Sequence, residues 1–273
     1  MAAYQTRNLR IGDIETRFLE AGSGPDLVLL HGGEYGASAE ITWRCNIAPL
    51  AQHFHVVAPD MLGWGGTEKI YNFSDPAGQR IRHIKRLLET LGVGKAFFVG
   101  NSAGGGTLLR ASVLDPMPLQ IQKMVTICGN ASVFKTVSQA DLENYTPSLE
   151  NMAKIVRLLF HDAQWHTPEI IRERYDASIL PGAWEALSAA RLRSPVHQAR
   201  STTDAFVKKL SRLQIPLLLM SCEHDPLNQK DWDVNFQKIV PGSRVHRFRN
   251  SAHEPQIEET EEFHRVLTEF LLS

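Results

Sequence analysis

Short runs of apolar residues, each followed by a turn signal, recur along most of the chain. These runs lie at 27–30, 55–58, 96–99, 124–127, 217–220 and, with more polar residues, 244–248. Near-continuous strands of this kind are typical of a parallel sheet covered on both faces. Apolar residues at helical spacing lie between several of them, as in 77–91 and 263–271. The alternation predicts an α/β fold with a mostly parallel, doubly wound sheet.

Residues 131–205 interrupt this alternation. The segment is polar, is punctuated by prolines, and offers helices at 149–160 and 169–187 but no convincing buried strand. We therefore expect a helical cap inserted over the carboxyl ends of the strands, where ligands of such sheets bind. The sheet core would then comprise 1–130 and 206–273. A cap of this kind shapes a pocket and excludes water from it.

Composition narrows the class of partner. The chain has 273 residues, 43% of them hydrophobic, and a net charge of −1. This balance gives no electrostatic reason to expect nucleic acid or an anionic membrane. The first residues lack the apolar stretch of a signal peptide, and no segment approaches a membrane span, so we expect a cytoplasmic protein. Cys45, Cys128 and Cys222 are too widely spaced for a metal site or a disulfide framework.

The segment Gly100-Asn101-Ser102-Ala103-Gly104 carries the clearest chemical signal. An apolar run precedes it and a helix-like segment, 105–114, follows it. A serine at the apex of such a strand–turn–helix has a strained backbone and an exposed hydroxyl. The two flanking glycines are a steric demand, because the strand and the helix approach closely at the turn. We predict that Ser102 is a nucleophile.

A serine hydroxyl needs a general base, and that base needs a carboxylate to fix its tautomer. Both residue types follow later strands: Asp225 comes after 216–222, and His253 comes after 243–249. The chain order Ser, Asp, His is the one found in enzymes with this type of serine turn. We predict a catalytic triad of Ser102, Asp225 and His253.

Other residues compete for these roles. The competing histidines at strand ends or in the expected cap are His31, His161, His166 and His224. His31 lies within His31-Gly32-Gly33 and is interpreted as structural, whereas His224 would point away from its neighbour Asp225. A cap histidine could contact substrate or simply be exposed. For the acid, Glu223 is the rival, and Asp60 is expected to brace the turn Gly63–Gly66.

The developing oxyanion needs two preorganised donors. The N–H of Ala103, just after the nucleophile, and the N–H of Gly33, after the first strand, are the candidates. Losing one such donor typically costs about 3–4 kcal/mol of transition-state stabilisation. The alternative is that Gly32-Gly33 forms only a tight turn and has no role in catalysis.

Together these features resemble the α/β-hydrolase superfamily over nearly the whole chain. The motifs are His31-Gly32-Gly33, Pro59-Asp60-Met61-Leu62-Gly63-Trp64-Gly65, Gly100-Asn101-Ser102-Ala103-Gly104-Gly105, Asp225 and His253. The resemblance implies an α/β-hydrolase fold with an inserted helical lid and no cofactor or metal. A serine at 102 argues against the haloalkane dehalogenases and epoxide hydrolases of this fold, which have aspartate there.

Within the superfamily the chain is most similar to the meta-cleavage-product hydrolases, which cut a carbon–carbon bond in vinylogous 1,5-diketones. The similarity lies in Asn101-Ser102, in the glycine-rich loop from His31 to Ala37, and in the cap segment Thr167–Tyr175. It implies substrate contacts from Arg174, Asn101 and Gly32. A guanidinium suits the carboxylate and enolate of a dienoate. The alternative to a substrate contact is that Arg174 is a solvated residue on the surface of a helix.

Four residues, at three places in the chain, depart from the pattern of that family. Glu34-Tyr35 replaces a usual Gly-Pro, Ala103 replaces a methionine after the serine, and Glu254 replaces a tryptophan after the histidine. These changes fall on residues that shape the substrate pocket. They leave the predicted triad intact.

The resulting expectation is a cofactor-free serine hydrolase acting on a small molecule. Ser102 would attack a carbonyl carbon, or activate water to do so, in a carbon–carbon bond cleavage. A carboxylesterase or lactonase for a small hydrophobic ester is the first alternative, and a ligand receptor on a hydrolase scaffold is the second. Dimers are common among such enzymes, so a homodimer is considered, although the sequence shows no interface.

Overall fold

An eight-stranded sheet with the order β1-β2-β4-β3-β5-β6-β7-β8 forms the centre of the computed structural model, which describes residues 4–134, 142, 144–192 and 203–273. Its strands are β1 (Gln5–Ile11), β2 (Ile14–Ala21), β3 (Asp26–Leu30), β4 (His55–Pro59), β5 (Ala96–Asn101), β6 (Ile121–Ile127), β7 (Leu217–Cys222) and β8 (Arg244–Phe248). Neighbours from β4 to β8 pair in parallel, whereas β1 and β2 add an antiparallel edge. The carboxyl ends of the parallel strands therefore meet at one edge of the sheet.

Alternation along each strand divides the core into two layers. In β3, Val28 and Leu30 face one layer, and Leu27 and Leu29 face the other. Both faces of the strand are buried, which is why its sequence is continuously apolar. This arrangement confirms the predicted doubly wound α/β fold.

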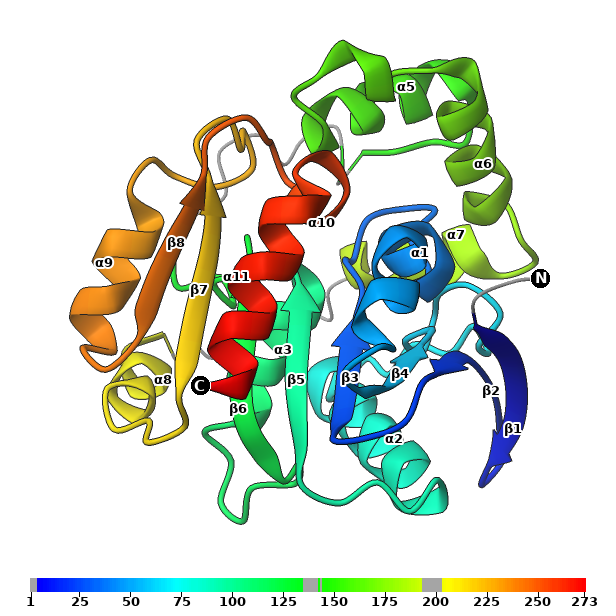
Figure 1. Ribbon diagram of the computed structural model, residues 1–273. Coiled ribbons are helices and arrows are strands. Elements are labelled where there is room, and N and C mark those ends of the chain that lie inside the picture. Colours follow the sequence, from blue (N-terminus) through cyan, green and yellow to red (C-terminus); the bar gives the residue numbers. More distant parts are fainter. Residues whose placement is uncertain (1–3, 135–141, 143, 193–202) are drawn as a thin grey trace.

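Helices cover both faces of the sheet (Figure 1). They are α1 (Ala39–Leu50), α2 (Pro76–Thr90), α3 (Ala103–Ala111), α8 (Thr203–Leu210), α9 (Trp232–Ile239), α10 (Pro255–Glu258) and α11 (Thr260–Leu272). Trp43 of α1 and Phe263 of α11 pack on one face, and Ile84 of α2 and Leu108 of α3 pack on the other.

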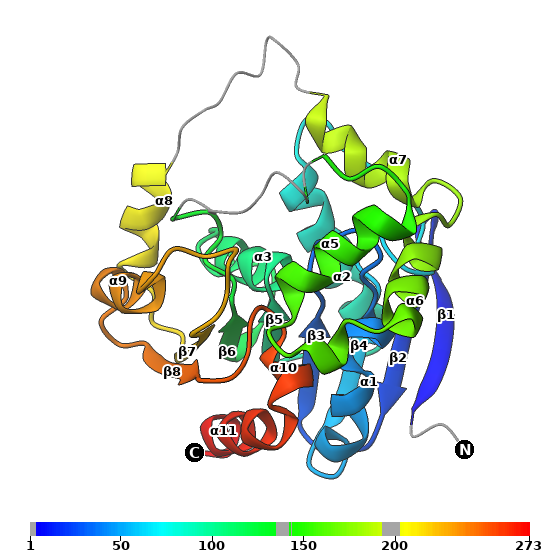
Figure 2. The same ribbon diagram turned by 90° about the horizontal axis from the view of Figure 1, so that it is seen from above.

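Between β6 and α8 the described chain forms helices but no strand. These are α5 (Leu149–Leu159), η1 (Ala163–Trp165), α6 (Pro168–Ser178), α7 (Ala183–Ser188) and η2 (Ala189–Arg191). Seen from above, α5, α6 and α7 lie over the carboxyl edge of the sheet (Figure 2). A third apolar cluster joins the cap helix α5 to Tyr35, Leu227 and Ile257 of the core loops.

Two details differ from the sequence expectation. The hairpin of β1 and β2 was not predicted, because its strands mix polar and apolar residues and contain exposed positions. The helix expected over 169–187 is two helices, since the chain turns at Pro181-Gly182, where Gly182 has φ +79°. The limits of the cap at 131 and 205 remain predictions.

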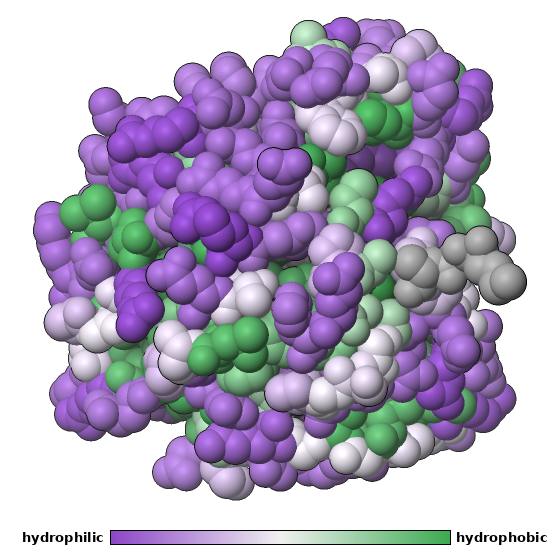
Figure 3. Space-filling model, in the orientation of Figure 1, coloured by the Kyte–Doolittle hydropathy of each residue, from purple (hydrophilic) through white to green (hydrophobic). Residues whose placement is uncertain are grey.

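Hydrophilic side chains dominate the upper part of the face shown in Figure 3, over the cap, and hydrophobic ones form separate small groups. No helix in the described ranges has both the length and the apolar character needed to cross a bilayer.

Candidate active site

A cavity of about 790 Å³ reaches the carboxyl edge of the sheet. Ser102 and His253 both line it, as do Gly33 and Ala103. Each of these residues immediately follows a strand or lies in the loop after one, so the parallel topology brings them to one place. The structure thus places the predicted nucleophile, base and oxyanion donors around a single cavity.

The turn at Ser102 has the strained geometry that its sequence predicts. Ser102 has φ 47° and ψ −110°, a conformation that side-chain-bearing residues rarely adopt. A Cβ on Gly100 would lie 2.4 Å from the backbone of α3, and one on Gly104 would lie 2.4 Å from the Leu30 carbonyl oxygen. The two glycines are therefore required by close backbone approach. The turn presents the Ser102 hydroxyl at the N-terminus of α3.

Asp225 and His253 form a buried pair. The Nδ1 of His253 lies 3.0 Å from Oδ2 of Asp225, and the side chains are 4% and 1% exposed. Asp225 also accepts hydrogen bonds from the Asn228 amide (2.7 Å) and the Leu227 backbone (2.9 Å). The carboxylate is thus held in one orientation by three donors. It in turn fixes the imidazole with Nε2 directed away from it.

Electrostatics favour the charged forms of this pair. Burial alone would lower the pKa of His253, but the Asp225 carboxylate outweighs it and raises that pKa well above its ordinary value. Burial would raise the pKa of Asp225, but its attraction to His253 and its hydrogen bonds lower it. The buried Nε2 of His253 has no hydrogen-bond partner among the described residues. It is therefore available to a group in the cavity.

The competing residues have other partners. Glu223 lies 3.7 Å from Arg247 and 3.6 Å from Arg249, in ion pairs at the surface. His224 stacks on His161 of the cap, with ring centroids 3.7 Å apart. Neither Glu223 nor His224 lines the described cavity.

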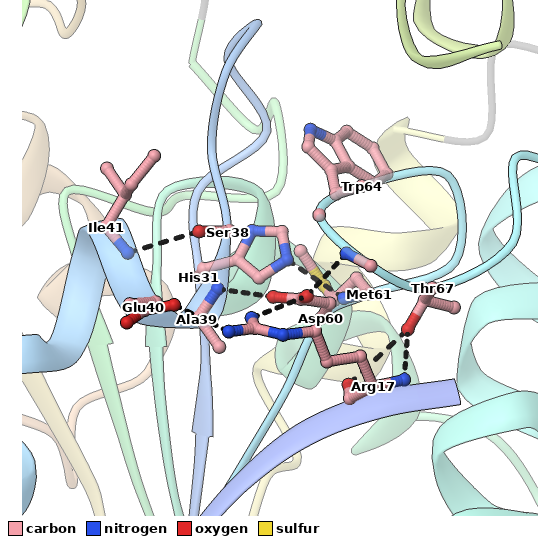
Figure 4. Close-up of polar contacts among 12 residues, drawn as sticks. Arg17, His31, Ser38, Ala39, Glu40, Ile41, Asp60, Met61, Trp64 and Thr67 are labelled. Atoms are coloured by element: carbon pink, nitrogen blue, oxygen red, sulfur yellow. Dashed lines mark hydrogen bonds and ion pairs between the residues drawn. The ribbon is translucent and has the colours of Figure 1, made fainter. Parts of the chain in front are cut away.

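Asp60 and His31 form a buried polar framework beneath the loops (Figure 4). Asp60 accepts hydrogen bonds from the backbone of Ala39 (2.7 Å) and Gly66 (2.7 Å) and lies 3.1 Å from Arg17. The Nε2 of His31 accepts from the Met61 backbone at 2.9 Å. Asp60 therefore braces the Gly63–Gly66 turn, as expected, and His31 is structural.

The two proposed oxyanion loops lie against each other. A Cβ added to Gly33 would lie 2.6 Å from the Cβ of Ala103. The N–H of Ala103 also belongs to the first turn of α3, where amides have no partner within the helix. Both loops border the cavity. The role of these two amides as oxyanion donors stays a prediction.

Arg174 is held in the protein interior. Its Nη1 lies 3.0 Å from Oε1 of Glu34, and its Nη2 lies 2.8 and 2.7 Å from the two carboxylate oxygens of Glu254. The side chain is 1% exposed and also stacks on Phe160, 5.3 Å from its ring centre. Arg174 is neither a solvated helix residue nor a residue of the cavity wall as described. This differs from the expected substrate contact, because two carboxylates already occupy the guanidinium.

Asn101 and Gly32 are also absent from the described cavity wall. Asn101 is buried, and its side-chain amide donates to the backbone oxygen of His253 at 3.1 Å. Gly32 accepts at its carbonyl from Nδ1 of His31 at 2.6 Å. In this structure both residues position the loops that carry Gly33 and His253.

Comparison with known proteins agrees with this geometry. The model of a family described as "Alpha/beta hydrolase family" matches residues 27–266. The chain belongs to the alpha/beta hydrolase family.

Within this family, the chain is similar to hydrolases whose names state their substrates. It is 30% identical to the 2-hydroxy-6-oxo-6-(2'-aminophenyl)hexa-2,4-dienoic acid hydrolase of Metapseudomonas resinovorans, over 99% of this chain and 92% of that protein. It is 26% identical to the 2-hydroxy-6-oxo-2,4-heptadienoate hydrolase of Pseudomonas putida, over 97% of this chain and 95% of that protein. Among solved structures, it is similar to a meta-cleavage product hydrolase from Pseudomonas fluorescens, with a TM-score of 0.85, 26% identity and 97% of each chain covered.

One group in the described part of this hydrolase brings three potential metal ligands together. Ligand atoms of Cys128, Asp225 and His253 lie within 4.8 Å of one another. However, Asp225 and His253 are paired with each other, and burial raises the pKa of Cys128 well above its ordinary value. Since a metal needs the thiolate, this environment disfavours binding.

Sequence reasoning missed the partners of Arg174. Glu34 and Glu254 were noted only as departures from a family pattern, although both replace uncharged residues by acids. That shared change of charge was the available signal for an ion pair. Reasoning from the sequence also missed Arg80 and Arg110. Both line the cavity, and no local motif marks either of them.

Proposed function

We propose that this alpha/beta hydrolase cleaves a carbon–carbon bond in a vinylogous 1,5-diketone, with Ser102, His253 and Asp225 as its catalytic triad. The observation that carries the proposal is the buried Asp225–His253 pair. The Nε2 of His253 has no hydrogen-bond partner among the described residues, and His253 lines the same cavity as the strained Ser102. The names of its relatives, which are dienoate hydrolases at 26–30% identity, support this substrate class.

The reaction begins with ketonisation of the dienol, assisted by His253, so that a methylene group flanks the carbonyl to be attacked. Ser102 Oγ then adds to that carbonyl carbon while His253 Nε2 takes the hydroxyl proton. The amides of Gly33 and Ala103 hold the oxyanion. Asp225 stabilises the imidazolium throughout.

Collapse of this intermediate breaks the carbon–carbon bond. The bonding electrons leave with the methylene carbon and delocalise onto the conjugated oxygen as a dienolate. That oxygen receives the proton from His253 to give a dienol, and the acyl group stays on Ser102. A water molecule, deprotonated by His253, then attacks the acyl carbonyl and releases a carboxylic acid. The sum is addition of one water across the carbon–carbon bond, with no oxidant or cofactor.

The second candidate is a carboxylesterase or lactonase, and one observation favours it. The ion pairs with Glu34 and Glu254 occupy Arg174, the residue that the family resemblance assigns to the acidic end of a dienoate. A neutral ester would need no such contact. The same triad would serve this reaction.

A comparison of substrates separates the two candidates. Purified enzyme is assayed separately on two substrates. Hydrolysis of 2-hydroxy-6-oxo-6-phenylhexa-2,4-dienoate is measured by its loss of colour, and hydrolysis of p-nitrophenyl butyrate is measured by the release of nitrophenolate. Carbon–carbon hydrolysis predicts a kcat/KM for the dienoate at least 100-fold above that for the ester, since substrate discrimination is a ratio of kcat/KM values. Ester turnover with an inert dienoate would instead establish the esterase.

A further inference from the structure

The cavity of this hydrolase contains a second arginine whose surroundings are unlike those of Arg174. Arg80 of α2 lines the cavity, and its Nε is buried without a hydrogen-bond partner in the described residues. Its guanidinium lies over the indole of Trp64, 5.5 Å from the ring centre. No carboxylate lies within ion-pair distance of Arg80 in the part of the chain that the structure describes. This partly buried cation therefore has no carboxylate counter-ion among the described residues, and such a charge is costly to leave unpaired.

Arg110 adds a further positive charge to the same cavity. It is the last basic residue of α3, and Ala103, Gly106 and Thr107 of that helix line the cavity with it. This spacing is one helical face, so the cavity runs along α3 from the nucleophile to Arg110. At 1.5 Å per residue, Arg110 begins about 12 Å from Ser102 along the helix.

The described residues supply one hydrogen-bond acceptor to the Arg110 guanidinium. Its Nη2 donates to the Ala131 backbone oxygen at 2.9 Å, and the group lies 5.4 Å from the ring centre of Phe206. Burial lowers the pKa of both arginines from their ordinary value, and Arg110 lowers that of Arg80 further. Both remain charged, because the arginine guanidinium stays protonated in proteins.

Trp64 connects this basic region to the reacting centre. A Cβ on Gly33 would lie 3.8 Å from the Trp64 ring, and the indole nitrogen donates to the Glu34 carbonyl at 3.1 Å. The Trp64 ring therefore lies next to both the Arg80 guanidinium and the loop that carries Gly33. A ligand anion there would lie a few bonds from the carbonyl that Ser102 attacks.

We propose that Arg80, assisted by Arg110, is the subsite that binds the carboxylate of the substrate in this enzyme. The guanidinium of Arg80 is planar, and its N–H donors have the arrangement that a carboxylate accepts from. Arg174 serves no such role, because its counter-ions are built into the protein. The inference rests on the proposed function in that the bound carboxylate is the acidic end of the dienoate.

Equilibrium binding tests this without turnover. Sorbate, a dienoate carboxylate, and sorbamide, its neutral isostere, are titrated calorimetrically into wild type, Arg80→Met, Arg80→Lys and Arg191→Met. Arg191 is the matched control, since it also lines the cavity but donates to Tyr35 Oη (2.8 Å) and the Tyr145 backbone (3.3 Å). Wild type should bind sorbate at least about 10-fold more tightly than sorbamide, as expected for a charged hydrogen bond.

Arg80→Met should abolish that preference while keeping the affinity for sorbamide, which shows that the variant is folded. Arg80→Lys should keep part of the preference, and Arg191→Met should keep it fully. Equal affinity of wild type for the two ligands would overturn the proposal, as would a preference that survives in Arg80→Met. Because no bond is broken, these results are independent of whether the enzyme hydrolyses the dienoate. A carboxylate preference in an enzyme that hydrolyses only esters would refute the proposed function and retain the subsite.

Discussion

Two arginines of this hydrolase, Arg174, which is buried, and Arg80, which is partly buried, differ in what neutralises their charge. Arg174, in the cap, has two carboxylate partners, Glu34 and Glu254, and a side chain that is 1% exposed. Arg80, on the core helix α2, lines the cavity and stacks on Trp64 without a carboxylate partner in the described chain. A buried cation is costly unless something neutralises it. The protein neutralises Arg174, whereas Arg80 is left for a ligand.

The comparison teaches that burial and residue type alone do not mark a binding residue. Arg174 lies in the cap segment whose family resemblance suggests substrate binding, yet its hydrogen-bonding capacity is used within the protein. Arg80 lies in no motif, yet retains an unsatisfied buried donor beside the cavity. Substitutions at Arg174, Glu254 and Arg80 each change one side of this comparison.

The largest effect is expected from Arg174→Met. Removing the guanidinium leaves Glu34 and Glu254 buried without a cation, which typically costs about 3–5 kcal/mol of folding free energy. Urea denaturation at pH 8, above the pKa of about 7 of Glu254, measures this cost.

Arg172→Met on the same helix is the matched control. Arg172 is exposed and lies 3.8 Å from Asp176, so its loss should cost less than about 0.5 kcal/mol. If Arg174→Met costs no more than this control, Arg174 is not held as an internal ion pair.

A smaller, pH-dependent effect is expected from Glu254→Gln. Burial raises the pKa of Glu254 to about 7, against the attraction of Arg174 and with further help from Glu34. Between about 4.5 and 7 the folded state therefore binds more protons than the unfolded state, and stability falls as the pH rises. Glu254→Gln should remove that loss, gaining up to about 3 kcal/mol relative to wild type between pH 5 and pH 8.

Denaturation curves at several pH values measure this difference, with Glu269→Gln as the control. Glu269 is 72% exposed, so its substitution should leave the pH profile of wild type unchanged. Parallel profiles for wild type and Glu254→Gln would mean that Glu254 is ionised at low pH, with Arg174 fully compensating its burial.

The smallest effect on stability is expected from Arg80→Met. Losing the stacking on Trp64 costs about 1 kcal/mol, whereas removing an unpaired buried charge is favourable, so the two nearly cancel. The free energy of unfolding should therefore change by less than about 1 kcal/mol, as measured by urea denaturation. A loss as large as that expected for Arg174→Met would make Arg80 a structural residue as well.

The sequence predicted the parts of the fold that local patterns encode. Buried parallel strands read as apolar runs, and catalytic candidates such as Asp225 and His253 follow them, so chain position alone brings them to one edge. The β1–β2 hairpin was missed because edge strands mix polar and apolar residues. The partners of Arg174 were missed because Glu34 lies 140 positions away and Glu254 lies 80, beyond any local periodicity.

The most direct test of the central claim compares wild type, Ser102→Ala and Ser112→Ala on the dienoate. Ser112 caps the other end of α3 and does not line the described cavity, so it controls for loss of a serine hydroxyl on that helix. We expect Ser112→Ala to retain wild-type turnover and Ser102→Ala to lose at least about 1,000-fold in kcat, as removal of a nucleophile does in other triads. Wild-type turnover by Ser102→Ala would contradict the proposed mechanism.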